Sequence, residues 1–586
     1  MSTLAIQGLE THLQGLGLEV PIPAFPTANI ISNPVDLYRC YVAEVVKQVV
    51  NCNEDMRTIP SNEHKCWHTA TWCWLLRASV SKGPVPKGVF IPIFFNETSL
   101  PRLILPDIFD RRQLYGHDKL AGLKNPKNEA PGRKKVIVEF SSPNIAKEFH
   151  AGHLRSTIIG AYISNLYKSM GWDVLKINYL GDWGKQFGLL AHLLDVYVKI
   201  NALFKSKQEA SKSARDNGQD TLEIENRGFL LSGMPSSKEW KIRDPEALSL
   251  WKRFRDISIE RYISTKNEGS WVINFEKHGA RKLGTAVVRN RGGATTYLLR
   301  DVAAVLERVE KYEFDKMIYV VSAEQDSYFQ RVFKTVEIMG YPDIAAKLVH
   351  INFGKVQGMS SGLGTVKFLS DILDECGNAM HEVMRSNEAK YAQVADPEAV
   401  ADVVGITAIM AQDMSGKRIN NYPFDITRMT SFEGNTSPYL QYSHARPCSI
   451  MRKANLTADQ VAKADFSLLK EPHAIDILRL MAQYPDMTIQ AFKTLEPTTI
   501  LTYLFRLTHQ VSSAYNVTKV LGTDEGPEVM LARSALYEGA RQVLENWHAI
   551  SWVYTNSKFF PSTSVLYWSS MFLHIQRPAL TNVLED

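Results

Sequence analysis

A short apolar strand, a small-residue loop and a helix follow one another near residue 150, and this unit constrains the fold most. The strand is predicted over Val136–Phe140, the loop over Ser141–Asn144 and the helix over Leu154–Met170. A His-x-Gly-His motif, residues 150–153, stands where that helix starts. A strand that leads through a loop into a helix is typical of parallel α/β sheets.

The His-x-Gly-His motif has the properties of a nucleotide site. A helix N-terminus offers unpaired N–H groups and a positive dipole end to phosphates. Gly152 removes the side chain where a flat base must approach the backbone. His150 and His153 can donate hydrogen bonds to a phosphate while a P–O bond breaks. The alternative is two surface histidines that only cap a helix.

Length and composition narrow the class of protein. A chain of 586 residues is too long for one core, so two to four domains are expected. The net charge of +5 permits an anionic partner such as nucleic acid without requiring one. No apolar run approaches the roughly 18 residues of a membrane span, so no membrane partner is expected. No secretory signal is expected, because Met1–Val20 lacks a basic region followed by an apolar core, and the absence of Arg from the first 38 residues argues against a mitochondrial transit peptide.

The cysteines favour a reducing compartment. The six cysteines form no C-x-x-C pair, which fits free thiols in the cytoplasm. One cluster, His64, Cys66, His68 and Cys73, does not have the spacing of a usual zinc module. We therefore predict no metal site there.

Residues 1–130 are predicted to form a separate N-terminal α/β domain. It contains an amphipathic helix over Val35–Val50 and a strand over Gly88–Phe95, and a short connection begins at Pro101–Arg112. Asn125–Lys135 is polar and contains Pro and Gly, which is typical of a linker.

Residues 131–425 alternate between strand and helix patterns, which predicts a parallel sheet with a polar insertion near 200–250. Further strands are expected over Asp173–Asn178, Met317–Ser322 and Leu348–Phe353. Further helices are expected over Leu189–Ile200, Thr296–Tyr312 and Gln330–Met339.

From residue 426 the pattern is helical, which predicts an all-α bundle over 426–586. Its helices are expected over Ala474–Gln483, Thr498–Tyr515 and Val529–Asn546. The tail, 551–586, is aromatic and Ser/Thr-rich without a clean period.

Other clusters carry possible chemistry. A glycine-containing run over Gly181–Gly188 follows the second strand, where ligands of open α/β sheets bind. Tyr297 and Asp301 are four apart and share a helix face, and an aromatic ring beside a carboxylate suits a planar guanidinium. The alternative is that Asp301 pairs with a nearby Lys or Arg. Gln325 follows a strand end and could bind an amino or carboxylate group, and the small-residue loop Gly358–Thr365 could close over a triphosphate.

Several of these motifs together resemble arginyl-tRNA synthetases. Ser141–Thr157 is similar to the ATP-site motif of that family. Four further parts are similar to other family motifs: Gly181–Gly188, the Tyr297/Asp301 pair, Asp413–Tyr422 and Gly434–Arg446. The similarity spans roughly residues 100–548, with gaps, and is greatest to fungal cytoplasmic and mitochondrial members.

The resemblance implies a class I Rossmann-type catalytic domain, an N-terminal domain that touches the tRNA D-loop and a C-terminal helical anticodon-binding domain. The implied activity is ATP-dependent ligation of L-arginine to tRNA(Arg) through arginyl-adenylate, with tRNA needed for the first step. ATP would act with Mg²⁺ and without a tightly bound cofactor. A cytoplasmic monomer is expected, with a mitochondrial form left open.

The resemblance also implies roles for single residues. Those assigned to catalysis are His150, His153 and Lys147. Those assigned to ATP are Phe149, Gly152, Met359, Ser360 and Ser361. Those assigned to arginine are Glu139, Asn144, Tyr297, Asp301 and Gln325. Asn96 matches a D-loop contact, and the anticodon-loop residues, suited to stacking on unpaired bases, are Tyr439, Tyr442 and Tyr515.

The chain departs from the family pattern in blocks. The second motif, Met359–Thr365, contains no basic residue, although Lys355 and Lys367 flank it. A block that normally follows Thr265 and supplies a second carboxylate is absent, and Glu148 brings negative charge near the triphosphate. Residues 51–85 and 551–586 do not resemble the family.

These departures leave an alternative to the active enzyme. The chain could be a catalytically impaired tRNA-binding paralogue, or the product of a gene with mis-called exons. A small-molecule nucleotidyltransferase with the same His-x-Gly-His motif is a third interpretation. The helical region after residue 426, with its anticodon-type tyrosines, argues against that third interpretation.

Overall fold

A computed structural model describes residues 99–143, 149–179, 265–291, 295–357 and 367–551 apart from a few single positions, with short stretches between 22 and 44. Several predictions fall on residues that it does not describe: the strand at 88–95, the helix at 189–200, most of the helix at 35–50, the insertion near 200–250 and the tail. The cysteine and histidine cluster at 64–73 also lies outside the described residues. Within the described part, no helix is long and apolar enough to cross a membrane.

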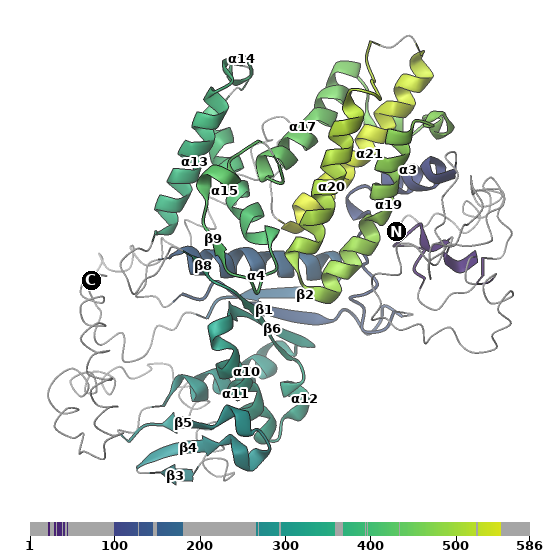
Figure 1. The fold of residues 1–586 in the computed structure, drawn as a ribbon. Helices are drawn as coiled ribbons and strands as arrows, with labels where there is room; N and C mark the ends of the chain where they lie inside the picture. The colour runs from purple at the N-terminus through teal and green to yellow at the C-terminus, as the bar shows by residue number, and fades with distance from the viewer. Residues whose placement is uncertain are drawn as a thin grey trace, which may run out of the picture. The chain divides into compact units, whose positions relative to one another are not determined.

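The described residues divide into two compact units (Figure 1). The sheet unit comprises residues 119–375 and 416–426. The helical unit comprises residues 1–118, 376–415 and 427–586.

A four-stranded parallel sheet forms the centre of the sheet unit, with the order β2-β1-β6-β7. Its strands are β1 Lys135–Glu139, β2 Asp173–Ile177, β6 Lys316–Ser322 and β7 Leu348–Phe353. All four predicted strands are confirmed to within one residue at each end. β1 is central, and Val136, Ile137 and Val138 are fully buried, as expected for a strand covered on both faces.

Helices cover both faces of this sheet (Figure 1). They are α4 Ala151–Ser169, α10 Tyr297–Tyr312 and α11 Asp326–Ile338. The predicted helices are confirmed, although α4 and α11 begin three and four residues earlier than expected. Because β2 lies on one side of β1 and β6 on the other, the strand order reverses between β1 and β6. Ligands of open α/β sheets bind at such a point, beyond the carboxyl ends of the strands.

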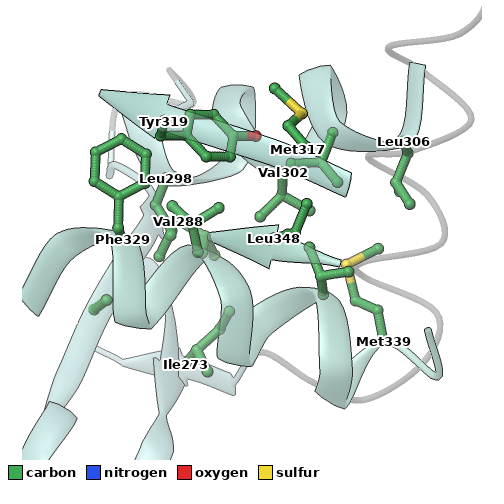
Figure 2. Close-up of a cluster of buried hydrophobic side chains, with 14 of the residues drawn as sticks. Ile273, Val288, Leu298, Val302, Leu306, Met317, Tyr319, Phe329, Met339 and Leu348 are labelled. Atoms are coloured by element: carbon green, nitrogen blue, oxygen red, sulfur yellow. The ribbon is translucent and has the colours of Figure 1, made fainter. Parts of the chain in front are cut away.

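A three-stranded antiparallel sheet adjoins α10 and α11 and is not predicted by the sequence. It comprises β3 Thr265–Asn267, β4 Ser270–Asn274 and β5 Thr285–Arg289. Figure 2 shows the buried cluster in which Ile273 and Val288 of this sheet meet Leu298 and Val302 of α10. The cluster continues onto the parallel sheet through Met317 and therefore fixes α10 against β6.

Two short strands close the sheet unit. β8 Val356–Gln357 pairs in parallel with β9 Tyr422–Pro423. The pairing joins the chain just after β7 to the segment 416–426.

The helical unit confirms the all-α prediction for the C-terminal part. Its long helices there are α17 Ser437–Ala454, α19 Pro472–Thr494, α20 Pro497–Tyr515 and α21 Pro527–Ser551. Among the described residues, the other helices of ten residues or more outside the sheet layer are α3 Ser99–Arg111, α13 Leu369–Arg385 and α15 Pro397–Ser415. The described residues also form the single-turn helices α14 Glu388–Tyr391, α16 Ile426–Met429 and α18 Ala458–Val461, and the sheet unit contains the single-turn helix α12 Pro342–Ala345.

The prediction of a connection beginning at Pro101–Arg112 is wrong, because this segment is helix α3. Pro106 lies inside the helix and gives the sequence its loop-like character. Buried Leu100, Ile104 and Ile108 recur at four-residue spacing, so one face of α3 packs inside the helical unit. This tertiary packing outweighs the cost of the internal proline.

Candidate functional site

His150 and His153 interact with the backbone and with each other at the start of α4. The Nδ1 atom of His150 accepts a hydrogen bond from the Gly152 N–H at 3.0 Å, and the Nδ1 atom of His153 accepts one from the His150 N–H at 3.4 Å. The two rings stack with centroids 3.9 Å apart. Because each Nδ1 is an acceptor, a neutral ring carries its proton on Nε2. The pair therefore provides two Nε2–H donors at a helix N-terminus, as binding to a phosphate requires.

Gly152 makes this arrangement of the histidines possible. A Cβ atom on residue 152 would lie 3.0 Å from Cε1 and 3.2 Å from Nδ1 of His150. A side chain at position 152 would therefore displace the His150 ring by a few tenths of an ångström from its place over the first turn of the helix. This role of Gly152 is additional to the predicted one, in which the missing side chain lets a nucleotide base approach the backbone.

The backbone of the motif is held by the chain that follows the second-motif loop. Leu369 N–H donates to the carbonyl oxygen of Phe149 at 3.0 Å, and His150 forms an antiparallel bridge with Phe368. The ring of Phe149 lies 5.4 Å from that of His153. The first motif is thus bonded to residues 368 and 369, which follow the second-motif loop in the chain.

Hydrogen bonds hold the loop after β1 in place, at the point where the strand order reverses. Ser141 adopts a left-handed backbone with φ of 54°, which costs about 1 kcal/mol for a residue with a side chain. Its N–H donates to Ser156 Oγ at 3.1 Å, and its own Oγ accepts from Thr157 Oγ1 at 2.7 Å. Ser156 Oγ in turn donates to the Val320 carbonyl of β6 at 2.8 Å. These bonds hold β1, α4 and β6 together beside the histidines.

Glu139 ends β1 and pairs with an internal arginine. Its Oε2 atom lies 2.6 Å from Nη1 of Arg308, and both side chains are buried. The Arg308 guanidinium also lies over the ring of Tyr179, 5.2 Å from its centroid. Burial raises the pKa of Glu139 to about 6, although Arg308 acts to lower it. The carboxylate that the resemblance assigns to arginine thus already faces a guanidinium.

Asp301 has a different partner from the one that the alternative interpretation expects. Its Oδ2 atom accepts a hydrogen bond from the Tyr328 hydroxyl, and it forms no ion pair with the described residues. Burial raises the pKa of Asp301 to about 6, while the Tyr328 hydrogen bond and Arg308 and Arg300 oppose the rise. Tyr297, one turn earlier, is half exposed, and Arg300 lies over its ring at 5.5 Å.

Gln325 lies at the same edge of the sheet. It ends the short 3₁₀ helix Ala323–Gln325 that directly follows β6, and it is exposed. The carboxyl ends of β1 and β6 therefore bring Glu139, Gln325 and the histidine pair to one edge of the sheet.

The predicted anticodon tyrosines lie in the helical unit. Tyr439 and Tyr442 are on α17, and Tyr515 ends α20. The guanidinium of Arg446 lies 4.3 Å from the ring centroid of Tyr442 and 4.8 Å from that of Tyr515. The Tyr439 ring is 5.0 Å from that of His509. Arg446 has no role in the sequence-based assignment, although its position four residues after Tyr442 is a signal for this contact.

Some predicted site residues lie outside the described residues: Asn96, Asn144, Lys147, Met359, Ser360, Ser361 and the run Gly181–Gly188. The lysines that flank the second motif are described. Lys355 pairs with Glu324 at 2.6 Å, and Lys367 pairs with Glu375. Both cations are thus directed at carboxylates of the protein itself.

The chain matches two protein families. Residues 118–262 and 252–426 match the family described as tRNA synthetases class I (R), catalytic domain. Residues 440–550 match the DALR anticodon binding domain. These two matches, together with the parallel sheet and the histidine pair, define the chain as a class I aminoacyl-tRNA synthetase.

The sequences of known relatives show which amino acid's synthetases the chain is similar to. A probable cytoplasmic arginine–tRNA ligase from Schizosaccharomyces pombe is 40% identical, over 92% of this chain and 97% of the relative. The cytoplasmic arginine–tRNA ligase of Saccharomyces cerevisiae is 47% identical, over 78% of this chain and 80% of the relative. The chain belongs to the arginine–tRNA ligases, the arginyl-tRNA synthetase family.

The fold is similar to that of a solved structure of Thermus thermophilus arginyl-tRNA synthetase. The TM-score is 0.61 at 19% identity, with 94% of this chain and 99% of that chain covered. This likeness concerns the fold alone.

Proposed function

We propose that this chain ligates L-arginine to tRNA(Arg) with ATP, by the reaction of its family and with the site residues described above. One observation carries the assignment of the site. The histidine pair and the carboxylates Glu139 and Asp301 belong to elements that meet at the β1/β6 edge of the sheet unit, where ligands of such sheets bind.

In the first step, a carboxylate oxygen of arginine attacks the α-phosphorus of ATP. The bond from that phosphorus to the bridging oxygen breaks, pyrophosphate leaves, and arginyl-adenylate remains. The Nε2–H groups of His150 and His153 would donate to the phosphate oxygens on which charge accumulates. Phe149 and Gly152 would contact ATP beside them.

In the second step, the terminal ribose 2′-OH of tRNA attacks the carbonyl carbon of the adenylate. The hydroxyl proton is released and AMP leaves, so arginyl-tRNA forms. Asp301 would bind the guanidinium of arginine beside the Tyr297 ring, and Gln325 would bind its amino acid end. Asn144, Lys147, Met359, Ser360 and Ser361 keep the roles that the resemblance gives them.

ATP would act with Mg²⁺. Among the described residues no group of three imidazole, thiol or carboxylate side chains could hold a metal ion. Mg²⁺ would be bound through the phosphates of ATP, as is usual for this ion, and no step here is assigned to it.

The tRNA would contact three parts of the chain, which correspond to the proposed domains 1–130, 131–425 and 426–586. In the last of these, Tyr442 and Tyr515 are more than a third exposed, and their rings are suited to stack on unpaired anticodon bases. Asn96 of the first domain would contact the D-loop.

We place the chain in the cytoplasm as a monomer. Identity to the cytoplasmic Saccharomyces cerevisiae ligase is 47%, against 41% to the mitochondrial ligase of the same organism. Light scattering of the purified chain tests the monomer, and microscopy of a fluorescently tagged chain tests the compartment.

Arginine-dependent exchange of pyrophosphate into ATP, measured with and without tRNA(Arg), tests the first step. We expect exchange only when tRNA is present. A chain that binds tRNA(Arg) but shows no exchange under either condition would instead be the impaired paralogue, which no observation in this structure favours.

A further inference from the structure

The guanidinium groups near Asp301 are both engaged elsewhere. Arg308 pairs with Glu139 and lies over the Tyr179 ring. Arg300 lies over the Tyr297 ring. It also donates to the carbonyl oxygen of Thr295 at 3.3 Å and to its hydroxyl at 3.4 Å. Of the two carboxylates, Glu139 has an internal cation and Asp301 has none among the described residues.

Tyr328 holds the remaining carboxylate. It lies in the first turn of α11, and its hydroxyl donates to Oδ2 of Asp301 on α10. The bond crosses between two helices that the buried cluster of Figure 2 fixes, with Val302 next to Asp301 and Phe329 next to Tyr328. It uses one carboxylate oxygen and leaves Oδ1 for a second donor.

We propose that Tyr328 is a positioning residue for arginine recognition, whose hydroxyl orients the Asp301 carboxylate toward the substrate guanidinium and keeps it ionised. The proposal rests on the proposed binding of arginine at Asp301. The ion pair between Arg308 and Glu139 supports the same role. Because Arg308 is held by Glu139, its guanidinium does not occupy the position beside Asp301 that the substrate guanidinium would take. Tyr328 acts through Asp301 and has no assigned contact with the reacting atoms.

The pH dependence gives this role a signature. The charged and titratable groups around Asp301 are Arg300, Arg308, Glu139, Tyr179, Tyr319 and Tyr328. Burial raises the pKa of Asp301, and the Tyr328 hydrogen bond lowers it. Without the hydroxyl the carboxylate is harder to ionise, so affinity for arginine should fall at a higher pH than in the natural chain.

The test compares Tyr328→Phe with the natural chain. We expect KM for L-arginine to rise about tenfold at pH 7.5 with kcat nearly unchanged, as loss of one hydrogen bond to a charged group predicts. The acid limb of kcat/KM should move from near pH 6 toward pH 7. Tyr312→Phe, at the far end of α10, is the matched control and should change neither quantity. An unchanged KM and limb in Tyr328→Phe would overturn the proposal.

Two further measurements separate this inference from the proposed function. Calorimetric binding of L-arginine, without ATP or tRNA, reports on Asp301 even in a chain that does not charge tRNA. Weaker binding by Tyr328→Phe supports the inference whether or not charging occurs. Two results with the natural chain alone would overturn the inference. One is an affinity for L-arginine that stays constant when the pH is lowered below 6, and the other is no binding of L-arginine at all.

Discussion

The guanidinium of Arg155 donates a hydrogen bond from Nη1 to the carbonyl oxygen of Gly354 at 2.6 Å. Arg155 is buried in α4, the helix that begins with the histidine pair, and Gly354 directly follows β7. The same guanidinium donates to the carbonyl oxygens of Asn420 at 2.9 Å and Arg418 at 3.1 Å. Arg155 therefore ties the first motif to the segment that leads into the second.

Replacement of Arg155 by lysine should destabilise the sheet unit. One ammonium group cannot reach all three carbonyl oxygens that the guanidinium fork reaches. Loss of one or two buried hydrogen bonds predicts about 2 kcal/mol less free energy of unfolding. Urea denaturation measures this change, with Arg281→Lys, at a highly exposed side chain, as the control. Equal effects of the two substitutions would contradict the role of Arg155.

Gly152→Ala should slow the reaction without unfolding the protein. The new methyl group would stand 3.0 Å from the His150 ring, so the ring must move. A displaced donor predicts a loss of roughly 10- to 100-fold in kcat. Gly416→Ala is the matched control, because a Cβ atom there has no neighbour within 4 Å. Full activity in Gly152→Ala would show that the observed ring position is not the reactive one.

Asp301→Asn should stabilise the protein while it abolishes arginine binding. The folded-state pKa of Asp301 is raised to about 6 from 3.8. The ionised form is therefore disfavoured in the folded protein, and stability is lost as pH rises from about 4 to 6. At pH 7.5 the substitution removes the cost of the ionised carboxylate, so the free energy of unfolding should rise. We expect a rise of about 1 kcal/mol, because partial exposure of the side chain to solvent reduces the full effect.

Thermal unfolding at pH 7.5 and pH 4 checks this prediction. The gain should be present at the higher pH and disappear at the lower one. Asp343→Asn, at an exposed position of α12, should show no such dependence. A destabilising effect of Asp301→Asn at pH 7.5 would mean that the hydrogen bond from Tyr328 to the ionised carboxylate outweighs the cost of its burial.

Arg446→Met should weaken tRNA binding. The guanidinium lies against the rings of Tyr442 and Tyr515, and its loss frees both rings and removes one cation. We expect about tenfold weaker binding of tRNA(Arg) and a salt dependence reduced by about one phosphate contact. Filter binding over a series of salt concentrations measures both. Arg452→Met, at the exposed end of α17, serves as the control, and an equal loss there would remove the special role of Arg446.

The parallel sheet and its helices can be predicted from the sequence because β1 and its neighbours are short apolar runs between loops. The antiparallel sheet β3–β5 cannot, because β3 is only three residues long and the exposed position 287 of β5 is a valine, so β5 shows no polar/apolar alternation in the sequence. Helix α3 could not be predicted because Pro106 lies inside it. The free-energy cost of this proline is offset by tertiary packing, which the sequence does not show.

The candidate site residues stand in motifs that are visible in the sequence, whereas the partners of their side chains are not. The His-x-Gly-His motif and the Tyr297/Asp301 spacing are visible locally. The contacts of Glu139 with Arg308 and of Asp301 with Tyr328 join residues far apart in the chain. No local pattern indicates which of several arginines and tyrosines will meet a given carboxylate.

Aminoacylation of total tRNA with labelled L-arginine by the purified chain tests the central claim most directly. His150→Asn is the comparison, since its amide oxygen can still accept from Gly152 N–H while the Nε2 donor is lost. We predict charging of arginine tRNA alone, reduced roughly 10²- to 10³-fold in the variant. Absence of charging by the natural chain, with tRNA(Arg) still bound in a gel shift, would contradict it and identify a binding paralogue.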